Sequence, residues 1–230
     1  MALVKPAAGK PRKTPKGAAR KPTPKPTRDP ERTRARILYA AKAEFAAHGL
    51  GGARVDRIAA NADANKRMLY YYFGNKDDLF LAVLEGAYAH IRDAEKELRL
   101  TEIDPPEAIR RLVAFTWEYY LEHPEFMNLL NSANLHQGRH LKKSAKVRTM
   151  HSPFVAMIEE VLERGRKSGV FRAGVDPVQL YISIAALTYF YLGNKFTLSE
   201  IFGRDLLSPR AKAERLGHMG ELVLGFLFKH

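Results

Sequence analysis

Between residues 65 and 76 the chain gathers basic and tyrosine side chains that can hydrogen-bond to a nucleic acid. Lys66 and Arg67 are of the two types that can donate two hydrogen bonds to O6 and N7 of guanine. The hydroxyl groups of Tyr70, Tyr71 and Tyr72 suit phosphate oxygens, as does the positive end of a helix. This chemistry favours a polyanion as the partner of this segment.

Two short helices joined by a tight turn would position these side chains. The pattern predicts one helix over residues 54–61 and a second over residues 65–72, with the turn at residues 62–64. Asn65 is a good N-cap for the second helix. Lys66, Arg67 and Met68 then lie at its N-terminus, the end that enters the major groove in a helix-turn-helix.

The segment resembles the TetR family of transcriptional regulators. The resemblance rests on Ile58-Ala59, on LYYYF at residues 69–73 and on NKDDLF at residues 75–80, and in detail it covers residues 33–80. It implies that the second short helix reads the major groove and that the next helix links this domain to a regulatory domain. The residues that it assigns to DNA contact are Arg54, Asn65, Lys66, Arg67, Met68, Tyr70, Tyr71, Tyr72 and Lys76.

The resemblance also assigns roles and leaves alternatives open. It implies that Lys66, Arg67 and Met68 face base edges and that Arg54 and Lys76 bind phosphate. The three tyrosines cannot all face one side, so at least one packs inside, and the family pattern favours Tyr70 or Tyr72 over Tyr71 for DNA. The lysine before Asp77-Asp78 also fits a simple charge pattern at a helix start.

Two positions depart from the family pattern. Asp63 stands in the turn where the family has glycine, and aspartate tolerates the left-handed backbone better than most residues. Ala53-Arg54 replaces the threonine or serine that caps the first short helix. We therefore expect an intact turn and a less tightly capped start of that helix.

The net charge of +13 is concentrated at the front of the chain. Residues 1–28 hold nine Lys or Arg and no acid, residues 29–76 hold nine basic and five acidic residues, and residues 77–230 hold twenty of each. Residues 1–30 contain seven prolines and are expected to form a disordered basic arm that either contacts DNA or is only a solvated tail. A negatively charged partner is therefore expected to bind the first third of the chain.

The sequence after the basic arm predicts an all-α protein of about nine helices, including the two short helices described above. Residues 31–76 form a three-helix DNA-binding domain and residues 77–230 a helical ligand-binding and dimerisation domain. The predicted helices span residues 32–48, 54–61, 65–72, 75–99, 105–122, 124–135, 140–167, 177–196 and 209 to the end.

Two apolar stripes near the end of the chain predict a homodimer through a four-helix bundle. The alternative is that both stripes only complete the core of one protomer. The predicted interface residues are Leu180, Ile184, Leu187, Tyr191, Leu216, Met219, Leu222, Val223 and Phe226.

A small-molecule effector is expected in the second domain, whose pocket should be apolar with a few polar groups. The candidates are Trp117, Tyr120, Asn134, His136 and Tyr181, and core packing is the alternative for each. Residues 123–126, 134–140 and 189–203 also resemble the regulators of pyrimidine utilisation. His136 and His140 have a spacing that two metal ligands can take, but Gly138 interrupts them and no third ligand is evident, so neither metal nor cofactor is expected.

Other functional classes fit the sequence less well. There is no cysteine, no nucleotide-binding loop and no catalytic triad pattern, so we do not expect an enzyme. No apolar run reaches the length of a membrane span, and we expect a cytoplasmic protein. The prediction is a ligand-responsive regulator that binds a palindromic operator as a dimer, with repression as the expected role and activation as the alternative that the sequence leaves open. The alternative is a nucleoid-type protein that binds DNA regardless of sequence.

Overall fold

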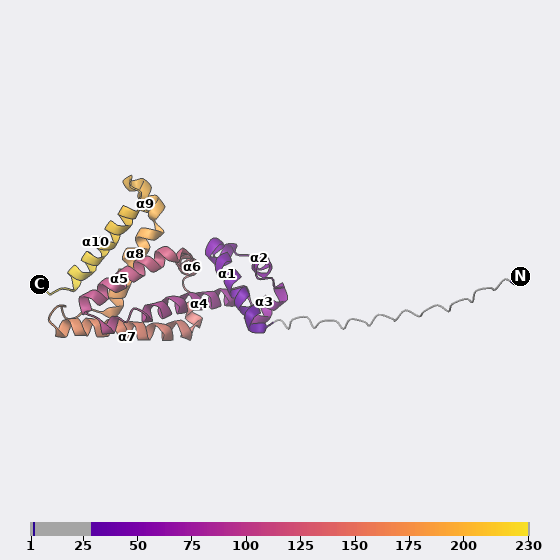
Figure 1. Cartoon of the computed structure of the whole chain (residues 1–230), viewed down its shortest axis with the longest axis horizontal. Coiled ribbons are helices and arrows are strands. Elements are labelled where there is room, and N and C mark those ends of the chain that lie inside the picture. The colour runs from indigo at the N-terminus through magenta and orange to yellow at the C-terminus, as the bar shows by residue number, and fades with distance from the viewer. Residues whose placement is uncertain (1, 3–28, 230) are drawn as a thin grey trace.

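A computed structural model describes Ala2 and residues 29–229, and in these residues it contains ten α-helices, two short 3₁₀ helices and no strand (Figure 1). A single bridge pairs Phe171 with Phe228. The elements are α1 (Pro30–Gly52), α2 (Val55–Asn61), α3 (Lys66–Phe73), α4 (Lys76–Lys96), η1 (Leu100–Glu102), α5 (Pro105–Glu122), α6 (Pro124–Leu135), η2 (Leu141–Lys143), α7 (Ala145–Lys167), α8 (Pro177–Gly193), α9 (Lys195–Phe202) and α10 (Pro209–Leu227). The all-α prediction is confirmed, while the predicted basic arm lies almost wholly outside the described residues.

Helices α1, α2 and α3 form the small domain at one end of the molecule (Figure 1). Asp29 caps α1 by accepting a hydrogen bond from the N–H of Glu31, and Pro30 occupies its first turn. Gly49 takes a φ of 63° inside the assigned span, so the regular helix stops there as glycine allows. Fully buried Ile37, Ile58 and Leu69 hold the three helices together.

The turn between α2 and α3 keeps its geometry without glycine. Asp63 adopts a φ of 45°, in the left-handed region that its short polar side chain tolerates. Its carboxylate lies 3.3 Å from Nη1 of Arg36 on α1. The expected turn is therefore present.

Helix α4 connects the small domain to the larger one. Asn75 caps it by accepting from the N–H of Asp78, and the apolar stripe of α4 is buried along its length. The helix packs on α1 in the small domain and on α7 in the larger one (Figure 1). Because α4 contacts both domains, a shift of α4 against α7 would also move its contacts with α1 and α3.

Helix α5 lies at the centre of the large domain. It contacts α4, α6, α7, α8 and α10, and its buried residues include Leu112, Val113 and Trp117. Helices α8, α9 and α10 project from this core as a separate lobe (Figure 1).

Three predicted boundaries are wrong. Helix α4 ends at Lys96 rather than at residue 99. Arg99 cannot belong to it, because this residue takes a left-handed φ of 47°. The helix predicted from residue 140 begins at Ala145, because Ser144 caps it by accepting from the N–H of Val147. The helix predicted to residue 196 ends at Gly193, and residues 195–202 form the separate helix α9.

Candidate nucleic-acid interface

One face of α3 presents the predicted reading residues to solvent. Lys66, Arg67, Tyr70 and Tyr71 are exposed, whereas Leu69 and Phe73 are buried against the core. Positions three and four apart share a helix face, so these four side chains form one continuous surface. We call Lys66, Arg67, Tyr70 and Tyr71 the reading face.

The N-terminus of α3 is capped as the sequence predicts. Asn65 Oδ1 accepts a hydrogen bond of 2.9 Å from the N–H of Met68, whose side chain is half-buried. Lys66 Nζ lies 2.8 Å from a carboxylate oxygen of Asp56 on α2. This hydrogen bond lowers the pKa of Asp56 and raises the pKa of Lys66. Both groups are exposed, so the ammonium group can exchange this exposed carboxylate for a base edge or a phosphate.

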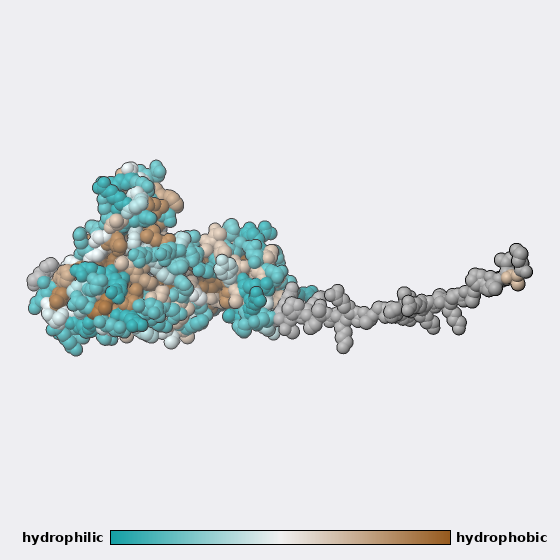
Figure 2. Space-filling view, viewed as in Figure 1, coloured by the Kyte–Doolittle hydropathy of each residue, from teal (hydrophilic) through white to brown (hydrophobic). Residues whose placement is uncertain are grey.

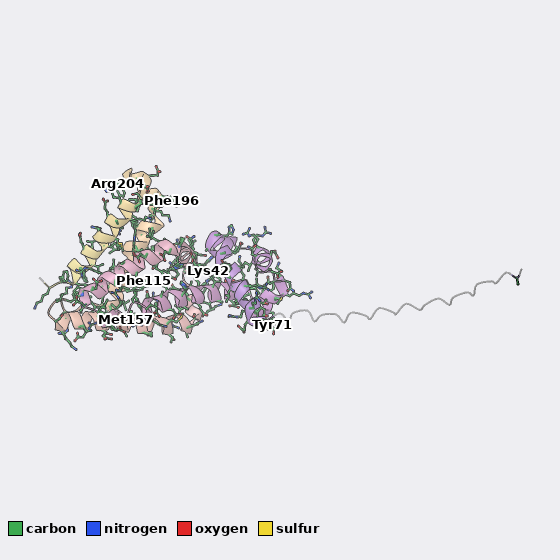
Figure 3. The ribbon with its side chains drawn as sticks, in the orientation of Figure 1. Lys42, Tyr71, Phe115, Met157, Phe196 and Arg204 are labelled. Atoms are coloured by element: carbon green, nitrogen blue, oxygen red, sulfur yellow. The ribbon has the colours of Figure 1, made fainter. Side chains whose placement is uncertain are left out.

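The three tyrosines are exposed to different degrees. Tyr71 is 83% exposed and Tyr70 is 43% exposed. Figure 3 places Tyr71 on the outside of the small domain. Tyr72 is half-buried and packs edge-on against Tyr71 and Phe73. On burial alone Tyr72 is the packing member of the trio, and Tyr70 and Tyr71 are the two with free surface for DNA.

The two predicted phosphate residues flank the reading face. Lys76 is the first residue of α4, and its Nζ is 3.5 Å from the carbonyl oxygen of Gly51. Arg54 immediately precedes α2, and its side chain is exposed. A cation beside a helix N-terminus, where N–H groups are free, makes a suitable phosphate contact. Their assignment to phosphate stays a prediction.

The sequence reasoning missed Glu44, which fixes the start of α2. The side chain of this α1 residue is buried, and its Oε1 accepts from the backbone N–H of Arg54 at 2.8 Å and from Arg57 Nη2 at 2.6 Å. No side chain caps α2 itself, as expected, so Glu44 supplies the acceptor from outside. Burial raises the pKa of Glu44, but the hydrogen bonds from Arg57 and Arg54 outweigh it and lower this pKa overall.

Replacing Glu44 with alanine should therefore lower the free energy of unfolding by about 2 kcal/mol, since hydrogen bonds to a charged group are lost near the surface. Urea denaturation at pH 7 measures this change. Because the folded pKa is depressed, the contribution of the carboxylate is present above the unfolded pKa and is lost as the pH falls through the folded value. Glu44→Gln should thus cost more at pH 7 than below pH 4. The role would be contradicted if Glu44→Gln lowered the free energy of unfolding equally at both pH values. It would also be contradicted if Glu44→Gln changed stability as little as the exposed control Glu118→Gln.

The small domain also contacts the large one through α6 and the loop that follows it. Ser132 Oγ accepts a hydrogen bond of 2.9 Å from the N–H of Leu50, and Lys42 Nζ lies 2.8 Å from Glu125. Figure 3 shows Lys42 at this junction. In the loop, His140 Nε2 is 2.7 Å from the carboxylate of Asp77, a contact that lowers the pKa of Asp77. The small domain is therefore joined to the large domain through α6 as well as through α4, whose N-terminal turn His140 also contacts.

Comparisons with known proteins agree with this architecture. The family model "Bacterial regulatory proteins, tetR family" matches residues 37–83, and "Tetracyclin repressor-like, C-terminal domain" matches residues 105–223. The repressor NicS of Pseudomonas putida is 43% identical over 84% of this chain and 92% of its own length. The chain belongs to the TetR family.

Other relatives extend the TetR likeness. The repressor SCO4008 of Streptomyces coelicolor is 41% identical over 60% of this chain and 69% of its own. Among solved structures, SCO4942 of Streptomyces coelicolor has 25% identity and a TM-score of 0.63, covering 85% of this chain and 98% of its own. The protein is thus a TetR-type transcriptional regulator, a non-enzymatic kind of protein. The finer resemblance to the regulators of pyrimidine utilisation is not confirmed.

The apolar stripes of α8 and α10 turn out to have two different faces. Leu180, Ile184, Met219 and Val223 are buried within the protomer, which corrects their placement at an interface. Leu187, Tyr191 and Leu216 are half-buried, and Leu222 and Phe226 are 46% and 48% exposed. The sequence did not single out the other exposed apolar side chains of α8 and α9, namely Val178, Ile182, Phe190, Phe196, Ile201 and Phe202.

The predicted effector residues do not come together in one pocket. Asn134 is exposed and His136 caps the end of α6, with its ring 6.0 Å from that of His140 near the junction. Trp117 packs against Tyr191, and Tyr120 against Phe126. Tyr181 accepts a hydrogen bond of 2.9 Å from Arg92 and packs against Phe154. Asn134 and His136 therefore lie apart from Trp117, Tyr120 and Tyr181, which pack inside the large domain.

The described residues contain no group of three or more His, Asp or Glu side chains that could hold a metal ion. None of the helices in the described part of the chain is both long enough and apolar enough to cross a bilayer.

Proposed function

We propose that this protein is a dimeric repressor that binds a palindromic operator and leaves it when a small molecule binds the larger domain. The observation that carries the proposal is the reading face of α3, where Lys66, Arg67, Tyr70 and Tyr71 stand together on an otherwise buried short helix. The relatives NicS and SCO4008 are named transcriptional repressors, which supports repression over activation. Such a role places the protein in the cytoplasm with the chromosome.

A second copy of this chain is the expected occupant of the exposed lobe. Between α8 and α10 lies an apolar groove of about 730 Å³, lined by residues that include Leu187, Phe190, Leu222 and Phe226. Figure 2 shows apolar surface on and below this projecting lobe. Large apolar side chains gathered on one face mark an interaction surface, and two-fold pairing is the commonest way to cover it. Pairing would present two reading faces to two half-sites of one operator.

Release would follow from movement of α4. This helix begins at the predicted phosphate residue Lys76 and ends beside the interior of the sensor domain. A ligand that favours another position of α4 changes the spacing of the two reading faces, and it weakens DNA binding by its differential affinity for the two states.

Selection of DNA tests the proposal directly. Purified full-length protein is incubated with sheared bacterial genomic DNA at near-physiological salt, and the retained fragments are sequenced and aligned. The proposal predicts a shared palindrome with half-sites about one helical turn or more apart. Retained fragments with no common sequence would instead support the nucleoid-type alternative, which no comparison favours.

A further inference from the structure

Arg92 and Glu95 are two ionisable side chains that are buried together inside the large domain. Arg92 and Glu95 of α4 are only 3% and 1% exposed, and Arg92 Nη2 lies 2.9 Å from Glu95 Oε1. The same Nη2 donates to the hydroxyl of Tyr181 on α8. Burying ionisable side chains such as these is unfavourable unless hydrogen bonds compensate for the lost water. Such a pair is therefore unusual in a domain that is otherwise packed with apolar side chains.

The hydrogen bonds of this pair are incomplete. Arg92 Nε and Nη1 have no partner, and neither do the Glu95 oxygens by hydrogen-bond geometry. An arginine offers five N–H donors in a fixed fork, a shape that matches a carboxylate. A buried donor left unpaired is destabilising, so these atoms need a ligand group or an ordered water as a partner.

A cavity adjoins these unpaired atoms. It holds about 50 Å³ between α4 and α7 and is lined by Arg92, Glu95, Phe154 and Met157, among others. Figure 3 labels Met157 on α7, the helix that packs on α4. Pro153, which also lines the cavity, removes one N–H from the interior of α7. The cavity has room for one planar head group, and the weakened turn of α7 is where it can widen.

Flat aromatic surfaces surround the guanidinium group. Arg92 Cζ lies 4.1 Å from the centroid of the Phe154 ring and 5.2 Å from that of Tyr181. The ring of Tyr181 packs edge-on against Phe154 at 5.0 Å. These surfaces suit an apolar or aromatic body attached to the head group.

The charge balance of the pair favours an anion. Burial raises the pKa of Glu95 to about 8, although Arg92 opposes this rise. At pH 7 most Glu95 side chains are therefore neutral. The site then carries one uncompensated positive charge that an organic anion would neutralise.

We propose that the effector of this protein is a small organic carboxylate whose head group binds Arg92 Nε and Nη1 in the cavity between α4 and α7. The inference rests on the proposed function, because it names the chemical class of the ligand that releases DNA. A cation would be repelled by the guanidinium group of Arg92, and a neutral amide would bring neither a negative charge nor a second oxygen to accept from it. Because Arg92 belongs to α4, the bound carboxylate acts directly on the helix that carries Lys76.

Matched acid and amide pairs test this inference. Binding of benzoate, phenylacetate and hexanoate to the full-length protein is compared by calorimetry at pH 7 with binding of benzamide, phenylacetamide and hexanamide. At least one acid should bind about tenfold or more tightly than its amide, a difference that one charge-assisted contact supplies. Arg92→Gln should remove that difference, whereas Arg99→Gln, an exposed arginine just beyond α4, should keep it. Equal binding of every acid and its amide, or acid binding that survives Arg92→Gln, would overturn the inference.

A pH series adds a readout that does not depend on the folding of the Arg92 variant. Ionised Glu95 competes with the ligand for Arg92, so acid binding should weaken about tenfold or more from pH 7 to pH 9.5 in the natural protein. In Glu95→Gln it should stay strong at both pH values. Burial lowers the pKa of His151, and it raises the pKa values of the surrounding tyrosines, so these groups stay neutral over most of this range. The titratable groups that face Arg92 and Glu95 are Tyr88 and Lys96 on α4, Tyr119 and Tyr120 on α5, His151 on α7 and Tyr181 on α8.

Operator binding in the same samples separates the two proposals. If the selected operator binds but no acid is preferred, the carboxylate inference fails and the repressor proposal stands. If an acid binds through Arg92 but no operator is found, the proposed function fails. An acid that binds with an unchanged affinity for the operator would overturn its role as effector.

Discussion

Replacing both Lys66 and Arg67 with alanine should lower the affinity for the selected operator by about 10²–10⁴-fold. Both side chains lie exposed on the reading face, and each good contact with a base edge is worth about 1–3 kcal/mol. Neither side chain contributes to the apolar core, so the variant should stay folded. Fluorescence anisotropy with labelled operator measures the affinity, and circular dichroism measures the helical content.

The matched control removes two positive charges elsewhere. Arg166 and Lys167 are exposed at the end of α7, which lies far from the small domain (Figure 1). Their double replacement by alanine should change operator affinity little. If both double variants lost the same affinity, the effect would be one of net charge, and the assignment of the reading face would be wrong.

Placing charge on the exposed lobe should produce the second large effect. Leu222→Arg combined with Phe190→Asp should convert the dimer into a folded monomer, because both side chains line the open groove between α8 and α10. A monomer binds only one half-site, so operator affinity should fall more than about a hundredfold. Sedimentation velocity measures the mass, and anisotropy measures the affinity.

A control on another exposed apolar residue isolates the interface. Leu135 is highly exposed at the end of α6 and does not line the groove between α8 and α10, so Leu135→Asp should leave both mass and affinity unchanged. If Leu222→Arg with Phe190→Asp remained dimeric and bound operator normally, the lobe would not be the dimer interface.

The small domain could be predicted closely from the sequence because its signals are local. Asn65 as a cap, Gly49 as a helix end and Asp63 in the turn each act within a few residues of themselves, and the structure has all three. Helix-turn-helix packing needs only the apolar positions of three short helices. The match of a family model to residues 37–83 agrees with that reading.

The contacts that the sequence did not reveal join distant segments. Nothing local marks Glu44 as the acceptor for Arg54, since the two meet only when α1 folds against α2. The pairing of Arg92 with Tyr181 likewise depends on how α4 and α8 cross α5. Periodicity could not separate the inward Ile184 from the outward Phe190, because α8 is apolar on nearly every side.

This TetR-type regulator should recognise one DNA sequence rather than DNA in general. The most direct test measures the affinity of the natural protein for the selected palindrome and for a scrambled duplex of equal length and composition, over a range of salt concentrations. We expect the palindrome to bind at least about 10³-fold more tightly at physiological salt. Equal affinities that fall together with rising salt would contradict it, because binding would then depend on phosphate contacts alone.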